Sequence, residues 1–200
     1  FAHGFEGSPS GSKPTYFQEQ LGHQVIAPLL HAEGWTIQDQ ASVLLQALDE
    51  DDEVKVLVGS SMGGLAASIV SAKRPDRDIG LLLLAPAFGR ISTFVEGLTA
   101  VEQNMWREQG THPYHHHGVG ETIRLPWSFI EVGAELEWTL PQHRTIIIHG
   151  REDDLVPLQN SLDVARRSPW VEAVHCPQDG HRLKESYDLM AEALERLIST

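Results

Sequence analysis

The stretch that decides how this chain can fold reads Val54-Lys55-Val56-Leu57-Val58-Gly59-Ser60-Ser61-Met62-Gly63-Gly64. Its apolar, β-branched first half predicts a strand buried on both faces, and the Ala-, Leu- and Ile-rich residues after it predict a helix. Between the two lies Gly-x-Ser-x-Gly, with Ser61 at its centre. Such a sharp turn needs glycine two residues either side of the serine, because larger side chains would collide there. The pattern therefore predicts that Ser61 projects from the C-terminal edge of a parallel sheet, at the start of a helix.

The charge of the chain limits the partners it can have. Acidic residues outnumber basic ones 28 to 15, which gives a net charge of −13. That balance argues against nucleic acid or an anionic membrane surface as a partner, since both would be repelled. It also disfavours polyanionic substrates and favours neutral ones. No apolar run is long enough to span a bilayer, so we expect no stable membrane insertion.

Cysteine content bears on the compartment. The chain has one cysteine, Cys176, so no disulfide can form within it. This favours a reducing compartment, and we expect a cytoplasmic location. The opening residues Phe1-Ala2-His3-Gly4 resemble the end of a strand, and we expect a few further residues upstream of them.

Strand-like and helix-like segments alternate along most of the chain. Strand patterns occur at residues 24–27, 54–59, 79–85, 145–149 and 171–175, and the chain opens on the end of another. Helical spacing of apolar residues occurs at 14–21, 36–48, 62–75, 157–167 and 183–198. About six strands alternating with helices predict an α/β fold, with a doubly wound, mostly parallel sheet. We expect a single domain over residues 1–200.

Residues 88–143 interrupt this alternation, and we refer to them as the insertion. Ser92 can cap a helix in which Phe94, Leu98, Val101 and Met105 share one face, and Pro126 can open a second helix. The pair predicts a short helical cap over the sheet edge that carries Ser61. Trp127 and Trp138 are the candidates for a substrate pocket, although these aromatics could equally pack the insertion onto the body.

The insertion also holds a cluster of four histidines: His112, His115, His116 and His117. Imidazoles at this density could bind a transition metal. Consecutive histidines cannot all face one ion, however, and no carboxylate or cysteine stands at ligand spacing. We therefore assign no metal site. No phosphate-binding glycine loop or other cofactor motif is present, so we expect no cofactor.

A serine hydroxyl becomes an effective nucleophile only when a base takes its proton and a third group orients the base. Gly150-Arg151-Glu152-Asp153-Asp154-Leu155-Val156-Pro157 follows one predicted strand and offers three carboxylates. Asp179-Gly180-His181 follows the last strand and offers a histidine. Both groups would lie at the edge of the sheet that carries Ser61.

In this order of nucleophile, acid and histidine the chain resembles a small member of the α/β-hydrolase superfamily. The resemblance implies that Ser61 is the nucleophile and His181 the general base. It implies that Asp153 is the orienting acid, because Asp153 fits the spacing Gly-x-x-Asp-x-x-Val-Pro and Asp154 is one residue off. It further implies that the backbone N–H groups of Phe5 and Met62 form an oxyanion hole, with His3 holding the loop of Phe5. His149, at a strand end, is interpreted as structural.

The resemblance implies a cofactor-independent serine hydrolase that acts on a small carboxylic ester or thioester through an acyl-enzyme. Carbon–carbon bond hydrolases and haloperoxidase-type enzymes of the same fold would keep the same residues. A different alternative is a binding protein of the same fold that has lost catalysis. The oligomeric state is left open.

Overall fold

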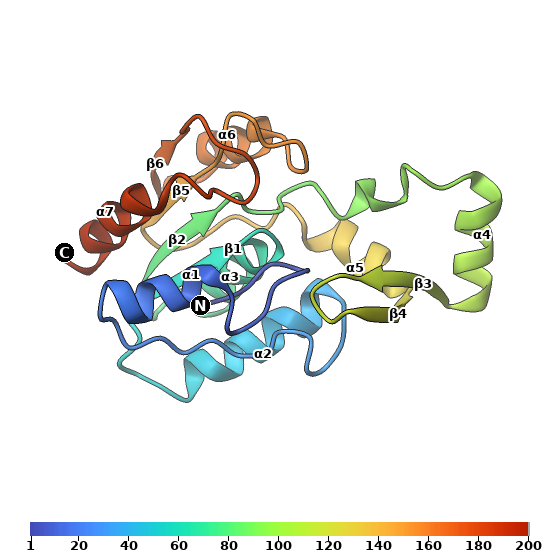
Figure 1. The fold of residues 1–200 in the computed structure, drawn as a ribbon, viewed down its shortest axis with the longest axis horizontal. Helices are drawn as coiled ribbons and strands as arrows, with labels where there is room; N and C mark the ends of the chain where they lie inside the picture. Colours follow the sequence, from blue (N-terminus) through green and yellow to red (C-terminus); the bar gives the residue numbers. More distant parts are fainter. Residues whose placement is uncertain (200) are drawn as a thin grey trace.

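The computed structural model describes residues 1–199, and a parallel sheet of four strands forms its centre (Figure 1). The strands lie in the order β1 (Val56–Ser60), β2 (Gly80–Leu84), β5 (Thr145–Ile148) and β6 (Val171–His175). Each pairing is parallel, so the carboxyl ends of all four strands meet at one edge. A single parallel bridge from Ala2 to Gly59 extends the sheet beyond β1.

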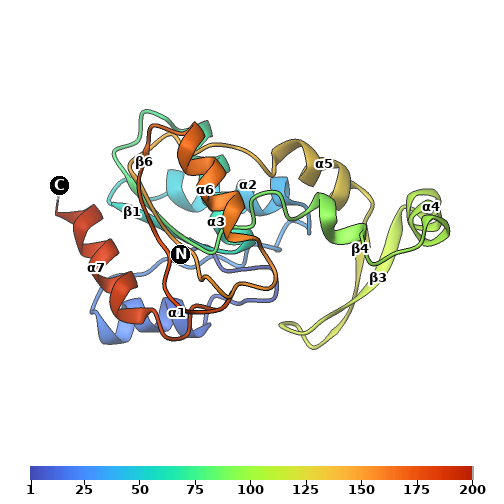
Figure 2. The same ribbon diagram turned by 90° about the horizontal axis from the view of Figure 1, so that it is seen from above.

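Strands β1, β2 and β5 bury side chains on both faces, which explains their near-continuous apolar runs, whereas the edge strand β6 is only partly buried. One face packs against α2 (Ile37–Asp49) and α3 (Met62–Lys73) through Leu57, Leu81, Leu83 and Ile147. The other packs against α7 (Tyr187–Ile198) through Val58, Leu82, Leu84, Ile146 and Ile148. Figure 2 shows α1 (Ser12–Thr15) and α7 together on one side of the sheet, and α2 and α3 on the other.

The helices outside the insertion begin and end close to the predicted positions. A π-helical turn, η1 (Tyr16–Gln20), continues α1, and α6 (Leu158–Arg167) packs beside β6. The start of α2 is a capping box: the Thr36 hydroxyl accepts from the Asp39 N–H at 3.1 Å, and the Asp39 carboxylate accepts from the Thr36 N–H at 3.0 Å. Two orphan donors are satisfied in this way at the first turn.

The insertion is built differently from the predicted pair of helices. It contains a short 3₁₀ turn η2 (Ser92–Val95), α4 (Ala100–Gln109), an antiparallel hairpin of β3 (Thr111–His116) and β4 (Glu121–Pro126), and α5 (Ser128–Leu136). Helix α4 lies at the far end of an arm that extends from the body (Figure 1). The prediction of one helix with Phe94, Val101 and Met105 on a shared face is wrong: Phe94 lies in η2, whereas Val101 and Met105 lie in α4 and are 68% and 50% exposed. Trp106, 1% exposed, is the residue of α4 that packs into the core.

The strand count also differs from the prediction. The central sheet has four strands where about six were expected, and residues 24–27 form no strand in the described part of the chain. That segment lies beside Phe1, whose backbone nitrogen donates to the Ile26 carbonyl at 2.5 Å. Within residues 1–199 no helix has the length and apolarity needed to cross a bilayer.

Candidate active site

The turn between β1 and α3 holds Ser61 in a strained conformation. Ser61 has φ 55° and ψ −119°, a backbone region that side-chain-bearing residues rarely enter. A Cβ on Gly59 would stand 2.4 Å from the Gly63 carbonyl oxygen, and one on Gly63 would stand 2.1 Å from that of Ala2. The two glycines are therefore required by close backbone approach. The Ser61 N–H donates to the Leu84 carbonyl at 2.9 Å, which ties the turn to β2.

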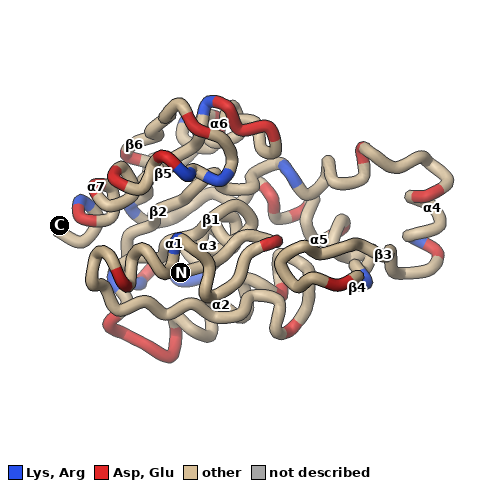
Figure 3. The backbone as a smooth tube through the Cα atoms, in the orientation of Figure 1, with Lys and Arg blue, Asp and Glu red and all other residues tan. Residues whose placement is uncertain are grey.

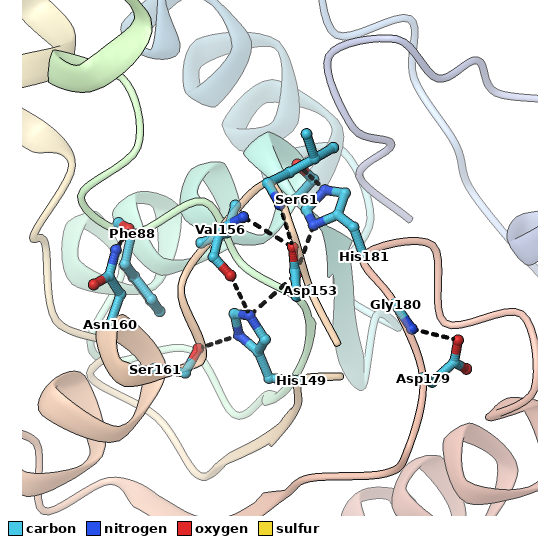
Figure 4. Close-up of polar contacts among 11 residues, drawn as sticks. Ser61, Phe88, His149, Asp153, Val156, Asn160, Ser161, Asp179, Gly180 and His181 are labelled. Carbon is cyan, nitrogen blue, oxygen red and sulfur yellow. Dashed lines mark hydrogen bonds and ion pairs between the residues drawn. The ribbon is translucent and has the colours of Figure 1, made fainter. Parts of the chain in front are cut away.

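His181 joins Ser61 to Asp153 (Figure 4). Its Nδ1–H donates to Asp153 Oδ2 at 2.7 Å. This leaves Nε2 as an acceptor for the Ser61 hydroxyl, whose oxygen lies 3.0 Å away. The side chain of His181 is 14% exposed and that of Asp153 is fully buried. Such a chain of contacts can withdraw the serine proton while holding the imidazole in one tautomer.

The carboxylate of Asp153 is held by hydrogen bonds to both of its oxygens. Oδ1 accepts from the N–H groups of Leu155 at 2.9 Å and Val156 at 2.8 Å. Burial alone would raise the pKa of Asp153, but the hydrogen bonds from His149, His181 and the Val156 N–H outweigh it and hold the pKa well below its usual range. Asp153 is therefore ionised at neutral pH. The neighbouring Asp154 is exposed and does not contact His181.

His149 also contacts this carboxylate, a role that sequence reasoning missed. Its ring is completely buried beneath Asp153. The Nε2–H is shared between the Val156 carbonyl at 2.9 Å and Asp153 Oδ2 at 3.1 Å, and the Ser161 hydroxyl donates to Nδ1 at 2.8 Å (Figure 4). His149 directly follows β5, the strand that leads to Asp153. That position was the only signal in the sequence, and it does not distinguish a structural histidine from one bound to the acid.

The loops that carry the acid and the histidine are packed against each other. A Cβ on Gly150 would stand 2.1 Å from the Asp179 carbonyl oxygen, so the two backbones touch. The Asp179 carboxylate accepts from the Gly180 N–H, the Glu185 N–H and the Ser186 hydroxyl, each at 2.8 Å. These bonds fix the loop around His181 from within, so His181 is presented to Ser61 by a rigid turn.

Phe5 and Met62 lie where the resemblance expects oxyanion donors. Both line the cavity that contains Ser61, and neither backbone N–H has a protein acceptor among residues 1–199. The neighbouring His3 holds the loop in place: its Nδ1–H donates to the Gly4 carbonyl at 2.9 Å, and its Nε2 accepts from the Leu30 N–H at 3.2 Å. Burial lowers the pKa of His3, so its ring stays neutral and suited to this pair of bonds.

The hairpin of the insertion contacts the same loop from outside. His116 is fully buried, donates through Nε2 to the Phe5 carbonyl at 2.7 Å and accepts at Nδ1 from the Val119 N–H at 3.0 Å. The Glu6 carboxylate accepts from the Tyr114 hydroxyl at 2.7 Å and the Gly118 N–H at 2.9 Å. Both ring nitrogens of His116 are thus used in backbone bonds. Across residues 1–199 no three His, Cys, Asp or Glu side chains are grouped so that they could hold a metal ion.

A cavity of about 490 Å³ opens over Ser61 and is the candidate substrate pocket. The insertion contributes four apolar or aromatic side chains to its wall: Ile91, Phe94, Tyr114 and Phe129. Trp127 and Trp138, which were predicted to line the pocket, do not line this cavity, so that prediction is wrong. Trp127 packs edge-on against Trp106 at 5.4 Å, and Trp138 lies against Gly89. Both tryptophans pack the insertion together.

Comparisons with known proteins agree with this architecture. Residues 1–198 match an uncharacterised protein family, UPF0227. Mouse (Mus musculus) mitochondrial palmitoyl-protein thioesterase ABHD10 is 34% identical over 158 residues, which cover 73% of this chain and 52% of the mouse protein. The chain therefore spans about half the length of the curated relative it matches.

Solved structures share the fold. The mouse α/β hydrolase domain-containing protein 10 superposes with a TM-score of 0.77 at 27% identity, covering 100% of this chain and 88% of that one. A putative hydrolase from Agrobacterium vitis S4 gives a TM-score of 0.80 at 24% identity, over 98% of this chain and 85% of the other. The predicted fold class is confirmed by the first of these. The chain belongs to the uncharacterised protein family UPF0227, within the α/β-hydrolase superfamily.

Proposed function

We propose that this protein is a cofactor-independent serine hydrolase that cleaves a carboxylic ester or thioester, with Ser61, His181 and Asp153 as its catalytic residues. The observation that carries the proposal is the continuous contact from Ser61 Oγ through His181 to the buried, ionised Asp153. A thioester is a reasonable substrate because the mouse relative is named a palmitoyl-protein thioesterase.

The first half of the reaction forms an acyl-enzyme. Ser61 Oγ attacks the carbonyl carbon while His181 Nε2 takes the hydroxyl proton. The carbonyl oxygen becomes an oxyanion, which accepts from the N–H groups of Phe5 and Met62. Asp153 stabilises the imidazolium and keeps its Nδ1–H directed away from Ser61. The bond to the leaving group then breaks, and His181 Nε2 gives the proton to the departing oxygen or sulfur.

The second half releases the acid. A water molecule takes the position that the leaving group had, and His181 accepts one of its protons as the oxygen attacks the acyl carbon. The same two N–H groups bind the second oxyanion. Collapse of this intermediate returns the proton to Ser61 Oγ and frees the carboxylic acid, so the net reaction consumes one water.

Labelling with a fluorophosphonate tests the nucleophile directly. The wild-type protein should form a stable adduct on Ser61, located by peptide mass spectrometry, and should hydrolyse 4-nitrophenyl esters and acyl thioesters. Ser61→Ala should lose labelling and lose kcat by several orders of magnitude. Ser60→Ala is the matched control, because it removes the same atom one residue away. Labelling at another residue, or more than a few per cent of the activity left in Ser61→Ala, would contradict the proposal.

A further inference from the structure

The cavity over Ser61 is positively charged within a strongly acidic protein. Three basic side chains line it, Lys13, Arg90 and Arg182, against one carboxylate, Glu6. In the whole chain acidic residues outnumber basic ones 28 to 15. The longest acidic run in Figure 3 follows α2 at residues 49–53, beside the amino end of β1 and so at the opposite edge of the sheet from Ser61.

The carboxylate of Glu6 does not neutralise these cations. Its two oxygens accept from the Tyr114 hydroxyl and the Gly118 N–H, and no ion pair joins it to a lysine or arginine in the described chain. Burial and the hydrogen bond to Glu6 raise the pKa of the Tyr114 hydroxyl to about 12. The positive charge of the cavity is therefore available to a ligand.

Lys13 and Arg182 form a pair beside the catalytic histidine. Lys13 Nζ donates to the Arg182 carbonyl at 2.7 Å, one residue after His181. Burial lowers the pKa of Lys13, and the nearby charge of Arg182 lowers it further, against the opposite effect of Asp179. Among residues 1–199 neither cation has a carboxylate within ion-pairing distance. An anion that contacts both would offset the cost of desolvating Lys13 and the repulsion between the two charges.

Arg90, the third basic residue of the lining, comes from a different part of the chain. It follows β2 three residues after Ala87, whose N–H donates to the Ser61 carbonyl at 3.0 Å. Its guanidinium donates to the Thr93 hydroxyl at 2.8 Å, at the base of the insertion. The neighbouring wall is apolar, formed by Phe94 and Phe129. This apolar part of the lining suits an acyl chain, and Arg90, whose guanidinium is bonded to Thr93, adds to the positive charge of the cavity.

We propose that the substrate of Ser61 carries an anionic group, a carboxylate or a phosphate, on its leaving group, and that Lys13 and Arg182 bind it. The inference rests on the hydrolase function proposed above and names its substrate class. The leaving group is assigned to this side because His181 delivers a proton to it and Arg182 follows His181 directly. The net charge of −13 led us to expect neutral substrates, but the basic residues of the lining are close to a bound substrate, and salt screens charges beyond about 8 Å.

Matched aryl acetates test the proposal. The carboxylate form is 4-acetoxybenzoate, the phosphate form is 4-acetoxyphenyl phosphate, and methyl 4-acetoxybenzoate is the neutral reference. Each kcat/KM is divided by the rate constant for hydroxide-catalysed hydrolysis of the same ester, which removes differences in leaving-group reactivity. The wild-type enzyme should prefer one of the two anions over the neutral ester by about 10-fold or more, the size of one charge-assisted hydrogen bond. Which anion is preferred identifies the group.

Substitutions locate the binding site. Lys13→Met and Arg182→Met should each reduce the ratio of anionic to neutral kcat/KM by about 10-fold, and Lys13→Glu should reverse the preference. Arg124→Met is the control, because Arg124 contacts Thr111 on the exposed hairpin and lies outside the cavity. A ratio that falls only in Arg90→Met would overturn the assignment to the leaving group.

The outcomes separate this inference from the proposed function. A wild-type enzyme that is labelled at Ser61 and hydrolyses the neutral ester as well as both anionic ones would overturn the anionic substrate and leave the hydrolase intact. Failure of labelling, together with no hydrolysis of any ester, would overturn the proposed function and this inference with it.

Discussion

Replacing His149 with phenylalanine should slow catalysis by loosening Asp153, although His149 does not reach the substrate cavity. Phenylalanine places an apolar aromatic ring in the same position and removes the Nε2–H, whose nitrogen lies 3.1 Å from Asp153 Oδ2. A hydrogen bond to a charged group contributes about 1.5–3 kcal/mol. The N–H is shared with the Val156 carbonyl at 2.9 Å, so the lower value applies. About 1.5 kcal/mol corresponds to a fall of about 10-fold in kcat/KM and a rise of about one unit in the pKa of Asp153.

The assay is ester hydrolysis, with the concentration of active sites set by fluorophosphonate titration. The loss should fall on kcat and leave KM unchanged, because Asp153 does not touch the substrate. His149→Gln should recover part of the activity, since the glutamine amide can donate to the same oxygen. The control is His143→Phe: His143 is also buried and bonded to a serine, Ser71 at 2.7 Å, but lies away from Asp153. It should lower stability only.

Two results would refute this reasoning. One is a kcat per active site in His149→Phe that equals that of the wild type within a factor of two. The other is an equal loss in His149→Phe and His149→Gln, which would assign the effect to packing around the ring.

Three further outcomes are expected. Gly63→Ala should abolish labelling or folding, because its Cβ would stand 2.1 Å from a backbone carbonyl oxygen, whereas Gly97→Ala, with no atom within 4 Å, should be tolerated in thermal unfolding. The urea concentration at the unfolding midpoint should decrease as the pH is lowered from 7.5 to 5.5. The reason is that the pKa of His3 is lowered in the folded state, so the unfolded chain takes up the proton first. An increase in the midpoint over this range would contradict the prediction. Phe94→Ala should shift the preferred acyl length of 4-nitrophenyl esters upward, because each added CH₂ that it can bury is worth about 0.8 kcal/mol. Trp138→Ala should lower stability and leave that preference in place.

The parts of the fold that the sequence predicts are those in which local pattern and burial agree. The strand before Ser61 is apolar on both faces and ends in glycines that the turn requires. The capping residues Thr36 and Asp39 mark the start of α2 within one residue. The candidate acid and base follow strand ends, and parallel pairing alone brings strand ends together.

The insertion could not be predicted in the same way, because the burial and secondary structure of its residues depend on contacts with residues distant in the chain. Val101 and Met105 have the spacing of a buried face, yet α4 extends from the body and leaves them in solvent. In β4 the side chains of Ile123 and Leu125 are buried, and those of Thr122 and Arg124 are exposed. This alternation marks a strand, but the histidine run before it carries no strand signal. Which aromatic residues line the cavity depends on how the insertion packs against the body, and the spacing of residues in the sequence does not predict that packing.

The hydrogen bonds between the hairpin and the loop that carries Phe5 and Glu6 bear on how substrates enter. Outward movement of the hairpin would break three hydrogen bonds together. They are the bond of His116 to the Phe5 carbonyl and the bonds of Tyr114 and Gly118 to the Glu6 carboxylate. Three such bonds cost about 3 kcal/mol, which keeps the open form below about 1% of the molecules. Opening would also release the loop that carries the Phe5 N–H, the proposed oxyanion donor, so we expect the open form to be inactive. We therefore expect substrate and product to pass exposed lining residues outside the hairpin, such as Leu155, while the hairpin keeps these bonds.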